Sequence, residues 1–287
     1  MRVESFLHTG SGAAGFAEKL RPLTANALDA LLLFSLGADH AVLRDAVKGV
    51  GCRCYLTETY GILGFDDDQF KNVEYMEKGR GSEYGFVGGS GGQGVLAVAY
   101  SGGGVSAGHE GLPPADARSA LVVADTSGAW KNAAAAAEVV PTHYGGITKE
   151  AWELKDDGSL HAVPYFWVAS TADAEPTGVL ATQDAVGQAT AALLQKLPPA
   201  LAPSGAIGAF PCFTRGVNQY GAEHVEPDEL SAALPGVRLY GMFAHGELGP
   251  SAFAGFAGAD TPAQPCTQHS MHTVLAVHTT ASTKEEL

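Results

Sequence analysis

Two short segments of this 287-residue chain carry residue types that can do chemistry. The first, residues 212–216, reads Cys-Phe-Thr-Arg-Gly at the end of an apolar run. A strand that ends this way presents Cys212 and Arg215 at a strand-to-loop switch, where a guanidinium can hold a carboxylate through two hydrogen bonds. Cys212 could act as a nucleophile if a base and a positive environment lowered its pKa. A core cysteine beside a structural ion pair is the alternative, and the sequence leaves both open.

The second segment, residues 241–250, reads Gly-Met-Phe-Ala-His-Gly-Glu-Leu-Gly-Pro. An apolar strand here leads into a glycine-bounded turn that displays His245 and Glu247. A buried Glu247 could accept an amine or pair with Arg215, whereas a solvated turn carboxylate is the simpler interpretation. The glycines around the turn indicate backbone angles that other residues avoid.

Together these segments resemble the C-terminal part of the FIST family, which has a Cys-x-x-Arg-Gly-type and a Gly-x-Phe-x-x-Gly-Glu-type signature. The last apolar strand, residues 274–278, and the paired glycines at 145–146 fit the same pattern. The resemblance implies a small-ligand sensor, with amino acids as proposed ligands, or a recruiting role like that of F-box ubiquitin-ligase receptors. It also implies a ligand site made of Cys212, Arg215, Gly216, Gly246 and Glu247.

Three functions compete. The first is a stand-alone, non-enzymatic FIST-like sensor or recruiter in intracellular signalling, in which Arg215 and Glu247 bind the two charges of a small polar metabolite such as an amino acid, or a protein partner. The second is a cysteine-dependent hydrolase or transferase with Cys212 as nucleophile and His245 as base. The third is a scaffold subunit that has lost ligand binding and uses the glycine-rich residues 64–104 for assembly. We expect no cofactor and no metal.

Other motifs favour structural explanations. Residues 10–15 fit the GxGxxG dinucleotide fingerprint, but the preceding strand carries Glu4 and Ser5, and a chain with 37 glycines produces such patterns by accident. Cys52 and Cys54 would face the same way in a strand, into the core. The histidines at 269, 272 and 278 lack the spacing of a joint metal site.

Composition narrows the class of partner. The chain is 46% hydrophobic and 17% charged, which supports a real core. Its formal net charge is −14 and its Lys and Arg residues form no cluster, so we expect neither nucleic acid nor an anionic membrane as partner. No apolar run is long enough to span a bilayer. Four cysteines are too few for a disulfide scaffold, which favours the cytoplasm.

The pattern of elements predicts an α+β fold, with two related subdomains whose mixed or antiparallel sheets pack against helices. The parts are residues 1–175, similar to the N-terminal FIST region, and 176–287, similar to the C-terminal one. A repeated Val-Leu-Ala-Val at 95–98 and 274–277 hints at related halves. We expect Asp39 to cap a helix, residues 28–36 to form a strand or a buried helix, a turn at 143–146, and a helix over 182–197.

Overall fold

The structure is a computed structural model that describes residues 2–9, 13–67, 69, 71–77, 93–102, 104–126, 130–171, 177–182, 186, 191, 195, 201–250 and 266–281. Its elements in the first part of the chain are β1 (Arg2–Thr9), α1 (Ala13–Thr24), β2 (Ala30–Leu36), α2 (His40–Val47), β3 (Arg53–Glu58), β4 (Gly61–Asp66), β5 (Lys71–Met76) and β6 (Gly94–Ser101). The middle part holds β7 (Val105–Gly108), β8 (Ser119–Ala124), α3 (Trp130–Glu138), β9 (Thr142–Ile147), β10 (Glu150–Leu154), β11 (Leu160–Ala162) and β12 (Tyr165–Ser170). The last part holds β13 (Thr177–Thr182), β14 (Leu201–Pro211), α5 (Val217–Tyr220), α6 (Val225–Ala233), β15 (Arg238–Met242), β16 (Glu247–Pro250), β17 (Cys266–His269) and β18 (Thr273–Ala281).

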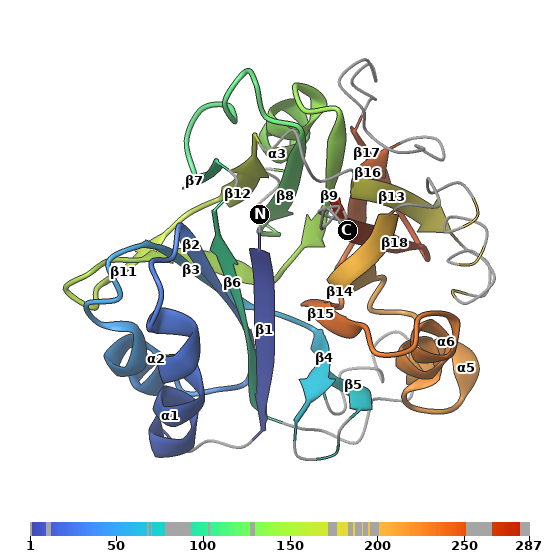
Figure 1. Cartoon of the computed structure of the whole chain (residues 1–287), viewed down its shortest axis with the longest axis horizontal. Helices are drawn as coiled ribbons and strands as arrows, with labels where there is room; N and C mark the ends of the chain where they lie inside the picture. Colours follow the sequence, from blue (N-terminus) through green and yellow to red (C-terminus); the bar gives the residue numbers. More distant parts are fainter. Residues whose placement is uncertain are drawn as a thin grey trace, which may run out of the picture.

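The strands form three six-stranded sheets with one shared plan (Figure 1). Sheet 1 has the order β1-β6-β2-β3-β10-β11, sheet 2 has β7-β12-β8-β9-β16-β17, and sheet 3 has β13-β18-β14-β15-β4-β5. In each sheet the middle pair is parallel and every other pair is antiparallel. The described part of the chain therefore forms three topologically equivalent units, which we call unit 1 (within residues 2–101), unit 2 (within 105–170) and unit 3 (within 177–281).

The units exchange hairpins in a ring. Each sheet takes four strands from its own unit and its last two from another. Hairpin β10–β11 of unit 2 completes sheet 1, hairpin β4–β5 of unit 1 completes sheet 3, and hairpin β16–β17 of unit 3 completes sheet 2. No unit can therefore complete its own sheet.

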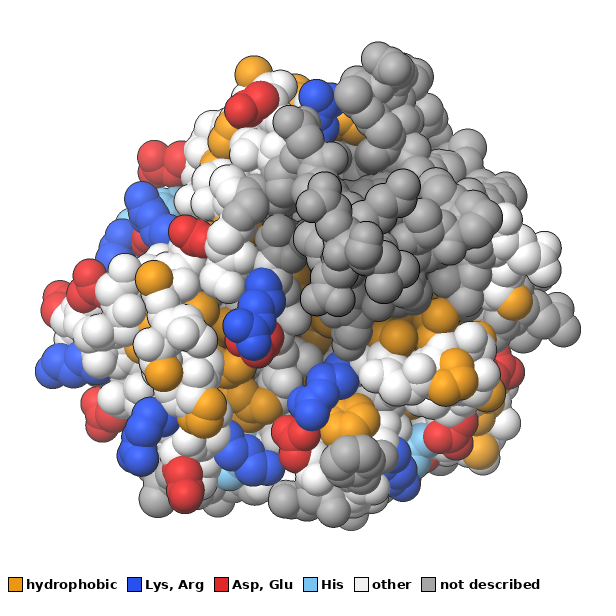
Figure 2. All heavy atoms as spheres, viewed as in Figure 1, with side chains coloured by type: hydrophobic (Ala, Val, Ile, Leu, Met, Phe, Trp, Pro, Cys, Tyr) orange, Lys and Arg blue, Asp and Glu red, His pale blue; other side chains and the backbone are white. Residues whose placement is uncertain are grey.

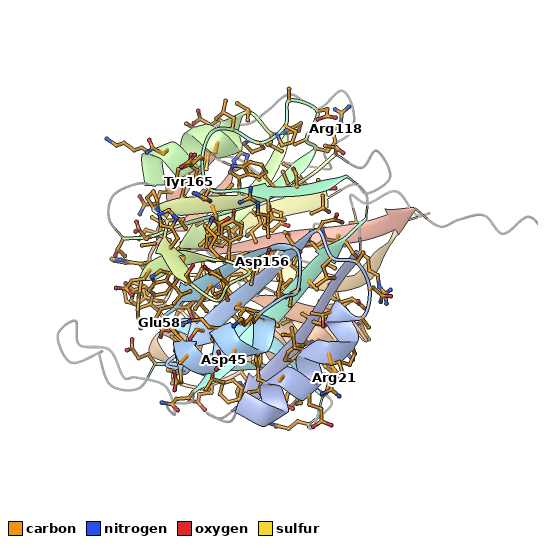
Figure 3. All side chains as sticks on the ribbon, turned by 90° about the vertical axis from the view of Figure 1, so that its left-hand side faces the viewer. Arg21, Asp45, Glu58, Arg118, Asp156 and Tyr165 are labelled. Atoms are coloured by element: carbon orange, nitrogen blue, oxygen red, sulfur yellow. The ribbon has the colours of Figure 1, made fainter. Side chains whose placement is uncertain are left out.

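The sheets enclose a common core and carry helices on their outer faces. The inner faces of all three sheets meet in one apolar cluster that includes Phe34, Phe166 and Phe210. Separate apolar clusters lie between sheet 1 and helices α1 and α2, between sheet 2 and α3, and between sheet 3 and α6. Figure 3 shows α1 and α2, marked by Arg21 and Asp45, over the outer face of sheet 1. Being covered on both sides, β2 and β8 are buried along their whole length.

Equivalent glycines confirm that units 2 and 3 correspond. A Cβ atom on Gly145 would lie 1.8 Å from the backbone oxygen of Val122, and one on Gly241 would lie 1.8 Å from that of Ala209. In each case the glycine is paired with the residue it would strike, on the neighbouring parallel strand. The corresponding position in unit 1 is Leu56, so the close approach is shared by only two of the three units.

The α+β class, with mixed sheets packed against helices, is confirmed. We expected two related subdomains, and the described residues form three related units. The Val-Leu-Ala-Val repeat lies in the corresponding strands β6 and β18. It is offset by one residue, because Ala97 and Leu275 hold equivalent positions. Strands from both sides of residue 175 share sheets 2 and 3, so the division at 175 stays a prediction about sequence segments.

Local expectations met mixed outcomes. Asp39 caps α2 by accepting a hydrogen bond from the Ala41 N–H at 2.8 Å, and residues 28–36 hold a strand. The turn at 143–146 is wrong, because the chain runs straight through as β9; its glycines serve close packing against β8. Most of the helix expected over 182–197, residues 78–92 of the glycine-rich segment and the start of the GxGxxG motif lie outside the described residues.

No helix in the described ranges combines the length and apolar character needed to cross a bilayer. On the face in Figure 2, basic and acidic side chains of the described residues are interspersed, without a basic patch.

Candidate functional site

The two segments singled out by the sequence meet where the parallel strands β14 and β15 end. Cys212 directly follows β14 and forms a parallel bridge with Ala244, which follows β15. The Ala244 N–H donates to the Pro211 oxygen at 2.8 Å, and the Cys212 N–H donates to the His272 oxygen at 2.8 Å. Carboxyl ends of adjacent parallel strands are where open α/β sheets place ligand sites.

Arg215 is fully buried and pairs with Glu226. Its Nε donates to Glu226 Oε1, its Nη1 donates to the Met271 oxygen at 3.2 Å, and its Nη2 donates to the Tyr220 hydroxyl at 2.6 Å. The Thr273 hydroxyl also donates to the Glu226 carboxylate, at 2.9 Å. The expected pairing of Arg215 with Glu247 is replaced by an ion pair with helix α6, so Arg215 holds the strand ends in place.

Both signature glycines occupy positions that exclude a side chain. Gly216 has φ 63°, and a Cβ atom there would lie 2.7 Å from the sulfur of Met76. Gly246 has φ 125°, and a Cβ atom there would lie 2.5 Å from Gln268 Nε2. The expectation of special backbone angles, made for the glycines around the second segment, holds at Gly246; Gly216 adopts such angles as well, and only glycine does so without strain.

Glu247 is buried with one of its oxygens unpartnered. The side chain has no exposed surface, and its Oε2 accepts a hydrogen bond from the His272 N–H at 3.2 Å. Its Oε1 has no hydrogen-bond partner in the described part of the chain. Burial raises the pKa of Glu247 to about 8, although the His272 N–H and the Cys212 thiol act in the opposite direction. A buried carboxyl with an unused oxygen is costly unless a ligand completes it.

Cys212 lies beside this carboxyl and is not activated. Burial, followed by the charge of Glu247, raises the pKa of its thiol. The Thr214 hydroxyl donates to its sulfur at 3.0 Å. A thiol in these surroundings stays protonated at neutral pH and is a poor nucleophile.

Cys212 and His245 are not brought together. Because Cys212 and Ala244 are bridge partners, the next residues along each segment, Phe213 and His245, point to the other side. There the exposed His245 ring packs 5.2 Å from the ring of Phe213 and 5.7 Å from that of Tyr60. The expected nucleophile and base therefore face opposite ways.

The histidines near the C-terminus have separate surroundings. The His278 ring is buried in the central core, where the Tyr240 hydroxyl lies 2.6 Å from its Nε2 and burial lowers its pKa to about 4. His272 lies next to His269 instead, with ring centroids 4.7 Å apart. The searched, described residues contain no group of three His, Cys, Asp or Glu side chains placed to hold a metal.

Three equivalent linkers, one in each unit, were not identified from the sequence as related positions. Tyr60, Lys149 and His245 each join the third strand of a unit to its exchanged hairpin, and so hold equivalent positions. The Lys149 ammonium lies 5.0 Å from the centre of the Tyr60 ring and 2.9 Å from a Glu77 oxygen. Their equivalence is visible only in the topology, because no shared motif marks these linkers. Glu226, Tyr220 and Thr273 were also missed, since nothing local distinguishes them.

Comparison with known proteins adds no relative. No protein-family model matches the sequence, and no curated protein matches it. The resemblance to FIST proteins therefore stays a prediction carried by residues 212–216 and 241–250.

Proposed function

We propose that this chain is a non-catalytic, FIST-like binding protein that receives the cationic group of a small polar metabolite at Glu247, beside Cys212. The observation that carries the proposal is the unpartnered Oε1 of a fully buried carboxyl at the ends of two parallel strands. An ammonium placed there would form a charge-assisted hydrogen bond and offset the burial of the carboxylate.

The unpartnered oxygen of Glu247 favours a cation as the recognised group, while burial raises the pKa of Glu247 and the nearby charge of Arg215 acts to lower it and opposes a second cation. Arg215 already holds Glu226, so its guanidinium positions the site and is not assigned to a ligand carboxylate. The pKa of the Glu247 carboxyl is raised to about 8, so this group holds a proton at neutral pH. Binding a cation would stabilise the carboxylate and release that proton. We therefore expect affinity to rise with pH between about 6 and 8.

The proposal includes a cytoplasmic location, which the free cysteines support. All four cysteines are free thiols, and Cys54, Cys212 and Cys266 are buried. Proteins that keep such thiols reduced are typical of the cytosol. A partner protein that recognises the ligand-bound form would complete a recruiting function.

The test is thermal unfolding with the proteinogenic amino acids and their decarboxylated amines. A ligand at a hundred times its dissociation constant adds about 2.7 kcal/mol to the free energy of unfolding. We expect at least one amine to raise the melting temperature, and the rise to vanish in Glu247→Gln, which keeps the shape and removes the charge.

Glu74→Gln is the matched control, because Glu74 is also buried and burial raises its pKa to about 7, but it lies on β5. This variant should keep the rise measured against its own baseline. No rise with any amine, or a rise that survives in Glu247→Gln, would count against the proposal.

A further inference from the structure

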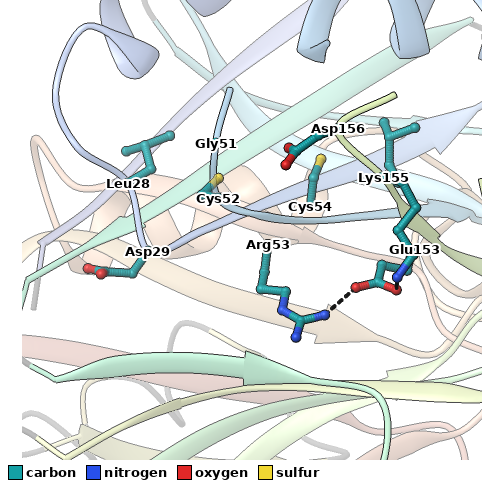
Figure 4. A pocket seen from close by; sticks show the side chains of 10 residues that line it. Leu28, Asp29, Gly51, Cys52, Arg53, Cys54, Glu153, Lys155 and Asp156 are labelled. Carbon is teal, nitrogen blue, oxygen red and sulfur yellow. Dashed lines mark hydrogen bonds and ion pairs between the residues drawn. The ribbon is translucent and has the colours of Figure 1, made fainter. Parts of the chain in front are cut away.

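A cavity of about 430 Å³ opens at the end of sheet 1, away from Glu247 (Figure 4). Cys52 lines it one residue before β3 begins, next to the first paired residues of that strand, Arg53 and Cys54. The cavity therefore reaches around the open end of the sheet. The proposed amine site lies elsewhere, at the carboxyl ends of β14 and β15 in sheet 3.

One side of the cavity presents two cations fixed by a buried anion. Arg53 Nη1 and Lys155 Nζ each form an ion pair with a different oxygen of Glu153, whose side chain is only 3% exposed. The Arg53 and Lys155 side chains remain 54% and 44% exposed. Because Glu153 orients both cations in advance, an incoming anionic group would meet two positioned donors.

The other side of the cavity presents two carboxylates around a thiol. Asp29, Cys52 and Asp156 all line this cavity. Burial, then the charges of Asp156 and Asp29, raise the pKa of Cys52 to about 11. The Gly102 N–H donates to Asp29 Oδ2 at 2.7 Å and holds that carboxylate in place. Figure 4 shows Asp29 on the opposite side from Lys155, with Cys52 and Arg53 between them and pointing to opposite sides of the strand. Asp156 is exposed, and Figure 3 labels it above α2.

We propose that this cavity binds a small zwitterion, whose anionic group lies between Arg53 and Lys155 and whose cationic group lies near Cys52, between Asp29 and Asp156. The volume falls within the range of small-molecule sites. Neither charge alone suits the cavity, because a simple anion would face the two carboxylates and a simple cation would face Arg53 and Lys155.

The test uses Cys52 as the reporter. Iodoacetamide alkylation at pH 9, quantified at the Cys52 peptide by mass spectrometry, is followed with a ladder of ω-amino acids from glycine to 6-aminohexanoate. Phosphoethanolamine replaces the carboxylate by phosphate, and propionate and propylamine carry one charge each. We expect one zwitterion length to slow the alkylation at least fivefold, while propionate and propylamine leave it unchanged. The comparison of β-alanine with phosphoethanolamine identifies the anionic group.

Variants locate the effect. In Arg53→Gln and in Asp156→Asn, the rate of Cys52 alkylation with the zwitterion should equal the rate without it. Arg238→Gln should keep the protection, because Arg238 is similarly exposed but pairs with Asp67 outside the cavity. Glu247→Gln should also keep it, which separates this site from the proposed amine site.

Equal protection by propionate or propylamine, no protection by any zwitterion, or protection that survives in Arg53→Gln would overturn the proposal. If a variant does not fold, the alkylation rates of wild-type Cys52 with zwitterions and with singly charged compounds still test the proposal.

Discussion

Arg215 and Glu226 form an ion pair in which neither side chain has exposed surface. The pair joins the loop after β14 to helix α6, and the Thr273 hydroxyl ties it to the start of β18. Three elements of unit 3 thus depend on one guanidinium. Arg215 also binds the Met271 oxygen, next to His272, whose N–H donates to Glu247.

Replacing Arg215 by Met should destabilise the fold by about 3–5 kcal/mol, because Glu226 would remain buried without its partner. Urea unfolding at pH 7 measures the loss. Arg238→Met is the control, since it breaks an exposed pair worth at most about 1 kcal/mol. Similar losses in both variants would mean that the buried pair contributes no more than a surface one.

Stability should fall as pH rises from about 6.5 to about 8, because below pH 6.5 the lowered pKa of His278 acts in the opposite direction. Burial raises the pKa of Glu247 to about 8 and that of Glu74 to about 7, from an ordinary value of 4.5. In this window the folded protein keeps protons that the unfolded chain has released, so rising pH favours unfolding. Each group contributes a slope of up to about 1.4 kcal/mol per pH unit.

Denaturant unfolding at pH 6.5, 7 and 8 checks this pH dependence. Glu247→Gln should flatten the curve up to pH 8, and Glu74→Gln should flatten it below pH 7. If either variant keeps the wild-type slope, that carboxyl is not protonated in the folded state.

Gly145→Ala and Gly241→Ala should each be strongly destabilising, by about 3 kcal/mol or more, because the new Cβ atom would strike a backbone oxygen of the neighbouring strand. Gly158→Ala is the control. Gly158 has φ 82° but no atom within 4 Å of the added carbon, so only the backbone cost of about 1–2 kcal/mol applies. Thermal melts of the three variants should show this order, and equal shifts would argue against the close approach.

Asp156→Asn should speed alkylation of Cys52 severalfold at pH 9. Burial is the largest cause of the raised pKa of Cys52, and Asp156 is the next, so removing that charge increases the thiolate fraction. Asp157→Asn is the control, because Asp157 is exposed and its carboxylate accepts a hydrogen bond from the Ser159 N–H. Mass spectrometry of the Cys52 peptide gives both rates, and an unchanged rate in Asp156→Asn would place that charge away from the thiol.

Local signals in the sequence predicted the helix cap and the first buried strand correctly and the turn at 143–146 wrongly. The cap at Asp39 depends on a side chain two residues from its partner, and the largely apolar run at 28–36 contains strand β2. The paired glycines at 145–146 led to a wrong prediction of a turn. The sequence alone cannot distinguish a glycine required by close packing from one required by a turn. The difference lies in Val122, a neighbour supplied by another strand.

The candidate site was only half visible in the sequence. Residues 212–216 and 241–250 were singled out from the sequence, which left their contact open, and the structure joins them through the parallel bridge between Cys212 and Ala244. The choice of Glu226 over Glu247 as the partner of Arg215 depends on where helix α6 packs, which no local pattern encodes. The cavity at Cys52 was equally hidden, since it requires β10 of the next unit to lie against β3.

The ring of exchanged hairpins also bears on how the chain refolds. Hairpin β4–β5 directly follows β3 in sequence, yet it pairs with β15, so sheet 3 stays incomplete until distant segments meet. Such non-local pairing slows folding. While it is pending, the open edge of β15 can accept the same hairpin from a second molecule, which would produce domain-swapped dimers. Refolding should therefore give monomers when dilute and interlocked oligomers when concentrated, with native strand pairing in both.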